Sequence, residues 1–174
     1  MNDNDKPEPV SKSPFWRFSI KFYAVPGVAQ ACIELQDQAG VDVNVLFFLL
    51  WNATEGRALN AADVTKVEEA IRPWREMTVV PIRNVRRALK SPPSVMTPEM
   101  AEGFRTRIKA VELEAERLQQ EALFGLAALG ALGHPAPSPA DAAWDSLSSY
   151  QGVIGPFPPG ALQTVLTAFA AFKP

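Results

Sequence analysis

The chain is poor in the side chains that most often bind metals or form covalent crosslinks. Among 174 residues there is one cysteine and one histidine. Cys32 cannot form a disulfide within the chain, and its apolar neighbours are typical of a small buried hydrophobe. His134 lies in a Gly- and Pro-rich stretch and is interpreted as a loop residue. Zinc or haem sites built from histidine pairs are excluded, and the sequence predicts neither a metal nor a cofactor.

Motifs for common enzyme chemistry are also missing. The sequence has no P-loop, GxGxxG, nucleophile elbow, HExxH or CxxC, which favours a non-enzymatic protein. Its longest apolar runs, 43–51, 122–133 and 161–172, are shorter than the roughly 20 residues of a membrane-spanning helix. The N-terminus lacks the pattern of a secretory signal. We therefore expect a cytoplasmic protein.

What the chain does contain is helical periodicity. Its length suits one domain with one core. We predict an all-α, single-domain bundle of six to eight helices around a central buried helix. Residues 1–13 are expected to be a disordered leader and 14–126 the bundle. Residues 127–174 are expected to be an Ala/Gly/Pro-rich tail, with a loop zone followed by a C-terminal helix near 159–172.

The central helix is expected after Asp42, where residues 43–51 are apolar on nearly every side. A helix that is apolar all round is a buried helix, although a buried strand gives a similar run. The most regular helix is expected at 98–126, after the capping residue Thr97. Its apolar face would include Met100, Phe104 and Leu118. The solvated face is expected to hold Glu102, Arg105, Lys109, Glu112 and Glu116.

Positive charge is concentrated in residues 72–90, although the whole chain has a net charge of −2. Pro73 and Pro81 each remove a backbone donor, so we expect two short helical pieces joined at a bend. This basic segment holds the first group of candidate binding residues, which are Arg72, Trp74, Arg75, Arg83, Arg86, Arg87 and Lys90.

Arginine is suited to bidentate contact with phosphate or carboxylate, so these residues could bind an acidic partner. They could also pair within the molecule, with Asp37, Asp42, Glu68 or Glu69, and join helices together, which is the favoured interpretation of a charged helix face. Trp74 could stack on a base or on an arginine, but its helical register is that of a core residue.

The second group of candidates lies at a helix–helix junction. Asp37, Asp42 and Asn44 supply oxygen atoms that suit a hard cation or an acid–base site. Such ions normally need more ligands than these, so helix capping by Asp42 and a buried hydrogen bond from Asn44 are favoured.

Three functions remain open. The first is a non-enzymatic interaction protein, an adaptor or assembly factor, whose arginines contact an acidic or phosphate-bearing protein; it requires Arg83, Arg86 and Arg87 to be exposed. The second is an enzyme or small-ligand binder, with a pocket between the Asp37–Asn44 junction and those arginines. The third, nucleic-acid binding, is disfavoured by the acidic net charge.

Several segments together resemble an uncharacterised proteobacterial domain-of-unknown-function family, over about residues 15–123. The segments are FW at 15–16, Tyr23, PGVA at 26–29, LQDQAGVDVN at 35–44, Trp74 and VPIRNVRRALK at 80–90. The resemblance implies a bacterial cytoplasmic protein of helical build, and it brings no catalytic residues.

Overall fold

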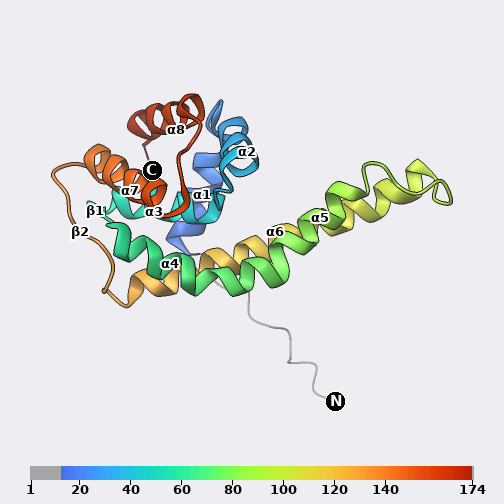
Figure 1. Ribbon diagram of the computed structural model, residues 1–174, viewed down its shortest axis with the longest axis horizontal. Coiled ribbons are helices and arrows are strands. Elements are labelled where there is room, and N and C mark those ends of the chain that lie inside the picture. Colours follow the sequence, from blue (N-terminus) through green and yellow to red (C-terminus); the bar gives the residue numbers. More distant parts are fainter. Residues whose placement is uncertain (1–12, 174) are drawn as a thin grey trace, which may run out of the picture.

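The computed structural model describes residues 13–173, and in this range the protein is almost entirely helical (Figure 1). The all-α fold class is confirmed. The α-helices are α1 (Pro14–Tyr23), α2 (Val28–Ala39), α3 (Val43–Thr54), α4 (Ala61–Trp74), α5 (Val80–Ala88), α6 (Pro98–Ala128), α7 (Pro139–Ile154) and α8 (Pro159–Ala171). The expected leader lies outside the described residues except for Ser13, whose hydroxyl caps α1. No helix in the described range is long and apolar enough to span a membrane.

Helix α3 is the buried centre of the molecule, as the sequence predicted. All but three of its twelve residues are buried, and it packs against α1, α6 and α7. Asp42 caps it, since its carboxylate accepts hydrogen bonds from the backbone N–H groups of Asn44 and Val45 at 2.8 and 3.4 Å. The capping role favoured for Asp42 is therefore confirmed.

The two prolines of the basic segment do not break the helix. Helices α4 and α5 are joined without interruption by a π-helical turn, η1 (Arg75–Val79). In this turn the N–H of Val80 donates to the carbonyl of Arg75, five residues earlier. A π turn inserts one residue into the helix, which shifts the hydrogen-bond register just before Pro81, the residue without a donor. The expected pair of short pieces joined at a bend is wrong.

The expected loop zone in residues 127–174 contains a helix that the sequence analysis missed. Helix α7 buries Ala142, Ala143, Leu147 and Tyr150 and packs against α3 and α4. A two-residue antiparallel pairing of β1 (Arg57–Ala58) with β2 (His134–Pro135) holds the connection between α6 and α7. The C-terminal helix is present as α8, which packs on α2.

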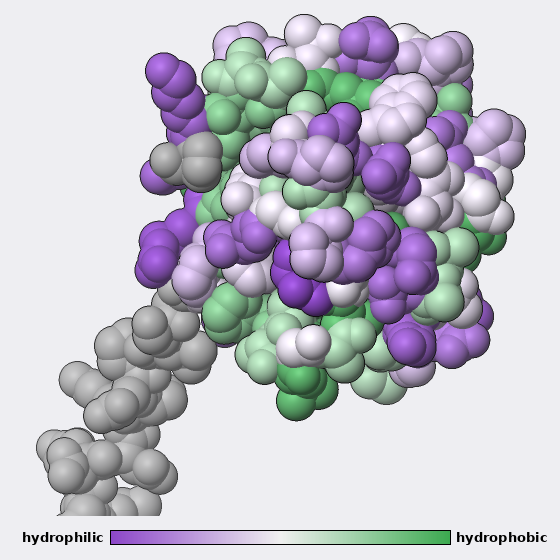
Figure 2. Space-filling model, turned by 90° about the vertical axis from the view of Figure 1, so that its left-hand side faces the viewer, coloured by the Kyte–Doolittle hydropathy of each residue, from purple (hydrophilic) through white to green (hydrophobic). Residues whose placement is uncertain are grey.

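Helix α5 and residues 98–118 of α6 form an antiparallel pair, here called the arm, which extends away from the other helices (Figure 1). On the arm the predicted faces of α6 are partly wrong. Met100, Phe104, Val111 and Leu118 are exposed, whereas Glu112 is buried. The opposite end of the molecule has a mixed surface, with hydrophilic side chains beside small hydrophobic areas (Figure 2).

Candidate functional site

Arg83 of α5 connects three helices. Its guanidinium donates to Glu112 Oε1 at 2.9 Å, to Glu116 Oε1 at 2.6 Å and to Gln36 Oε1 at 2.7 Å. Both glutamates project from α6 and Gln36 projects from α2, so one side chain joins the arm to α2. The sequence analysis placed both glutamates on the solvated face, because helical periodicity alone did not show that α5 would pack there.

The neighbouring arginines are also paired within the molecule. Arg86 binds both carboxylate oxygens of Glu112, and Arg87 binds Asp37 at 2.9 Å. The exposed fractions of the Arg83, Arg86 and Arg87 side chains are 19%, 21% and 45%. The exposure that the interaction hypothesis requires is therefore absent for Arg83 and Arg86. It holds for Arg87, although this residue also has a partner.

Arg75 belongs to a separate cluster, here called the Asp42 network. Arg75 donates to Asp42 at 3.0 Å and to Glu68 at 2.8 Å. The hydroxyl of Tyr150 donates to Glu68 at 2.8 Å and accepts from the backbone N–H of Asp42 at 3.1 Å. Gln119 donates to Asp42 at 2.6 Å. The network joins α3, α4, η1, α6 and α7, and burial together with the two carboxylates holds the pKa of Tyr150 well above its ordinary value.

Of the remaining candidates, two are packed inside the protein and two are exposed at its surface. Trp74 is half-buried and its indole N–H donates to the carbonyl of Ala115 at 3.0 Å. Arg72 and Lys90 are exposed. Asn44 is buried, and its carboxamide oxygen accepts from Gln120 at 2.7 Å, which is the buried hydrogen bond that the sequence analysis favoured.

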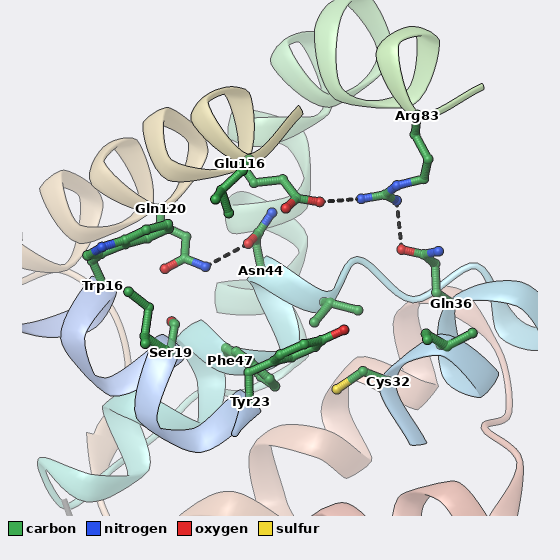
Figure 3. Close-up of a pocket in the computed structure, with 14 residues that line it drawn as sticks. Trp16, Ser19, Tyr23, Cys32, Gln36, Asn44, Phe47, Arg83, Glu116 and Gln120 are labelled. Atoms are coloured by element: carbon green, nitrogen blue, oxygen red, sulfur yellow. Dashed lines mark hydrogen bonds and ion pairs between the residues drawn. The ribbon is translucent and has the colours of Figure 1, made fainter. Parts of the chain in front are cut away.

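A pocket of about 310 Å³ lies between α1, α2, α3, α5 and α6, and is here called the Phe47 pocket (Figure 3). Its floor includes the buried side chains of Cys32 and Phe47. The large hydrophobic residues around it are unusually exposed for their type: Ile20, Tyr23, Ile33 and Leu113. Exposed apolar residues around a concave site are typical of a ligand-binding surface.

Two buried polar atoms among the lining residues have no hydrogen-bond partner within the described part of the chain. They are Nε1 of Trp16 and Oε1 of Gln120, and both side chains are more than nine-tenths buried. Figure 3 shows the Gln120 carboxamide beside the Trp16 ring, with its oxygen turned toward Ser19. Less than 1 Å² of each atom is accessible, so neighbouring side chains cover both of them and neither opens into the pocket.

Burial raises the pKa values of three of the titratable groups that line the pocket. Burial raises the pKa of the Cys32 thiol to about 12, so the thiol is protonated at neutral pH and is a poor nucleophile. Burial is also the largest cause that raises the pKa values of Tyr23 and Glu116, although Arg83 opposes both shifts. The protonated Cys32 thiol is therefore unsuited to covalent catalysis.

A smaller cavity of about 200 Å³ lies at the junction that the sequence analysis singled out, between Asp42, Arg75 and Arg83. Gln36 and Arg83 line both cavities, and the hydrogen bond between these two side chains lies where the cavities adjoin. No group of three or more His, Cys, Asp or Glu side chains suited to a metal ion occurs in residues 13–173.

The sequence analysis did not single out Trp16, Gln120 or Glu116 as site residues. In the sequence Trp16 is one of several aromatic residues in the segment that forms α1, and Gln120 belongs to no motif. A polar residue beside the apolar positions of α6 was the one signal that could have pointed to Gln120.

No curated protein matches the chain, and no solved structure matches it either. Residues 14–123 match the family described as "Protein of unknown function (DUF2390)". All residues that line the Phe47 pocket lie in this range, whereas α7 and α8 lie beyond it. Because the match covers more than half of its length, the chain belongs to this family of unknown function.

Proposed function

We propose that this protein binds a small, largely apolar ligand in the Phe47 pocket, which was the second of the functions that the sequence left open. The observation that carries the proposal is the exposed apolar rim around a pocket of about 310 Å³ that has Phe47 buried on its floor. Burial of these apolar side chains against a ligand removes them from water and so favours binding.

The low reactivity of Cys32 and the absence of a free carboxylate at Glu116 favour binding over an enzymatic reaction. Glu116 is held by Arg83 at 2.6 Å. Of the residues named for this function, Asn44 and Arg83 line the pocket, whereas Asp42 lines the smaller cavity. Asp37 instead pairs with Arg87 and does not line the pocket.

The uncharged dye N-phenyl-1-naphthylamine tests this proposal, because its fluorescence rises in an apolar site. We expect saturable binding to the wild-type protein and at least tenfold weaker binding to Leu113→Glu, which puts a charge on the rim. Met100→Glu is the matched control, since Met100 is equally exposed on the same helix but outside the pocket. Equal binding by both variants, with unchanged circular dichroism, would contradict the proposal.

A second candidate is the interaction protein that the sequence first suggested, with a different contact surface. The exposed Met100, Phe104, Val111 and Leu118 follow one side of the arm. Residues 80–118 hold eight basic and five acidic residues, a net +3 against −2 for the whole chain. Two such arms would repel each other, so the charge favours an acidic amphipathic helix of another protein over a second copy.

The same two variants test this second candidate with their roles reversed. A tagged protein should capture an acidic protein from host extract in a salt-sensitive manner. Met100→Glu should abolish capture, whereas Leu113→Glu should retain it. Capture that survives Met100→Glu, or dimerisation through the arm in sedimentation velocity, would contradict an acidic partner on this surface.

A further inference from the structure

We infer that Gln36 limits the length of the ligand, because its side chain closes the Phe47 pocket on the side of the smaller cavity. The wild-type protein then selects a short apolar chain or ring that ends at the hydrogen bond between Gln36 and Arg83. This inference rests on the proposed ligand-binding function and specifies the size class of the ligand at the same site.

The partition between the two cavities consists of two side chains. Gln36 of α2 and Arg83 of α5 line both the Phe47 pocket, of about 310 Å³, and the smaller cavity, of about 200 Å³. The Arg83 guanidinium donates to Gln36 Oε1 at 2.7 Å (Figure 3). An apolar tail that passed this point would break that bond. Losing a hydrogen bond to a charged group should weaken binding at least about tenfold, so ligands that end before the partition are preferred.

The two members of the partition are held differently. Arg83 also donates to Glu112 at 2.9 Å and to Glu116 at 2.6 Å, and both glutamates project from α6. These contacts fix the guanidinium without help from Gln36. Gln36 itself is half-buried and donates to the neighbouring Asp37 at 3.3 Å, which is a long contact in an exposed place. Removing the Gln36 side chain should therefore open the partition while Arg83 and the helices stay in place.

The smaller cavity could accept the end of a longer apolar chain. Val41 and Val79 line it and are buried. Its charged residues Asp42 and Arg75 are paired with each other at 3.0 Å, so an uncharged chain would face no unpaired charge there. Each methylene that leaves water beside the valines should tighten binding about fourfold. Gln36, and not the chemistry of the smaller cavity, is therefore what keeps a longer ligand out.

A series of 1-alkanols tests the inference, since its members differ in length and share one uncharged head group. The affinities of 1-hexanol, 1-octanol and 1-dodecanol are measured by competition with N-phenyl-1-naphthylamine. The ratio of the 1-dodecanol affinity to the 1-hexanol affinity should be about tenfold larger in Gln36→Ala than in wild type, because about two more methylenes are buried. The affinity for 1-hexanol should not change.

Two control variants separate the Gln36 side chain from its surroundings. Asp37→Ala changes the next residue of α2, which lines neither cavity but does contact Arg87. Gln36→Glu keeps an acceptor for Arg83. Both should retain the wild-type ratio of affinities. A ratio that rises in Asp37→Ala as much as in Gln36→Ala would overturn the role of the Gln36 side chain.

Nuclear Overhauser effects between the alkanol chain and valine methyl groups show where the chain lies. Val43 lines the Phe47 pocket and not the smaller cavity, whereas Val79 lines the smaller cavity and not the Phe47 pocket. Bound 1-dodecanol should contact Val43 in both proteins and Val79 in Gln36→Ala alone. The wild-type spectrum decides the question by itself if the variant does not fold.

Contact with Val79 in wild type, or equal ratios of affinity in wild type and a folded Gln36→Ala, would overturn the inference. Either result, with the dye still bound, would leave the proposed ligand-binding function standing. Failure of the dye and of all three alkanols to bind wild type would overturn both.

Discussion

The two ends of the Phe47 pocket differ in how their polar groups are satisfied. At one end Arg83 contacts three acceptors on two helices, and each contact is 2.9 Å or shorter. At the other end Trp16 Nε1 and Gln120 Oε1 are buried without partners. The first end is built to hold helices together, because breaking it leaves the buried carboxylate of Glu112 without one of its cations. The second has no polar contact to lose, so it contributes little to stability.

This difference separates residues for structure from residues for binding. The arginines that first attracted notice as a partner surface belong mostly to the structural group, together with the Asp42 network. The residues proposed for binding are the apolar side chains of the rim, which carry no charge. Substitutions at the two ends should therefore change different measured quantities.

The largest loss of stability is expected for Arg75→Ala. It leaves the carboxylates of Asp42 and Glu68, both about 95% buried, without their cation. We expect the free energy of unfolding to fall by about 3 kcal/mol. Urea denaturation measures it, and Arg72→Ala on the same continuous helix is the control, with a change within about 0.5 kcal/mol. Similar small losses for both would contradict a structural role for Arg75.

Arg83→Met should cost about 2 kcal/mol, since hydrogen bonds to charged groups are lost while the apolar part of the side chain is kept. The loss is smaller than for Arg75 because Arg86 still neutralises Glu112. A double-mutant cycle with Glu112→Gln should give a favourable coupling energy by urea denaturation. A coupling of zero would show that this end of the pocket does not stabilise the protein.

Trp16→Phe should cost about 1 kcal/mol, which is the value for a slightly smaller ring in a packed site. The indole N–H has no partner to lose. Thermal and urea unfolding both measure this. A loss above that of Arg83→Met would mean that the N–H is already satisfied, and it would remove the contrast between the two ends.

The smallest effect is a pH dependence at Glu116. Burial raises its pKa above the ordinary value of 4.5 in the folded protein, although Arg83 opposes the shift. The folded state therefore holds this proton more tightly than the unfolded state, and the stability that it adds is lost as pH rises from about 4.5 through the raised pKa.

The Glu116→Gln variant has no carboxyl group at this position, so it does not lose this stability as pH rises. Its free energy of unfolding, measured by urea denaturation, should therefore increase relative to wild type between pH 4.5 and 7. Arg86 and Arg83 lower the pKa of Glu112 against the effect of burial, so the stability from Glu112 is lost at pH below 4.5, in both proteins alike. A constant difference between wild type and Glu116→Gln across the range would contradict the raised pKa.

Local signals in the sequence predicted the helices with clear ends. Asp42 and Thr97 are caps, and α8 begins at Pro159 as expected. Helix α7 was missed because its Ala-rich sequence follows a Gly- and Pro-rich stretch. Pro73 and Pro81 misled because the π turn between them accommodates the missing donor, which depends on the helix being held by its neighbours.

The sequence alone determined the all-α class, the buried α3 and the capping role of Asp42, because each follows from the pattern of neighbouring residues. Only the tertiary structure decided which way the arginines point and which buried polar atoms stay unpaired. Those outcomes depend on which helices meet: α5 lies over Glu112 and Glu116, and α1 brings Trp16 beside Gln120. Pairing between residues about a hundred positions apart leaves no trace in local periodicity, so the candidate binding pocket appears only when the chain is folded.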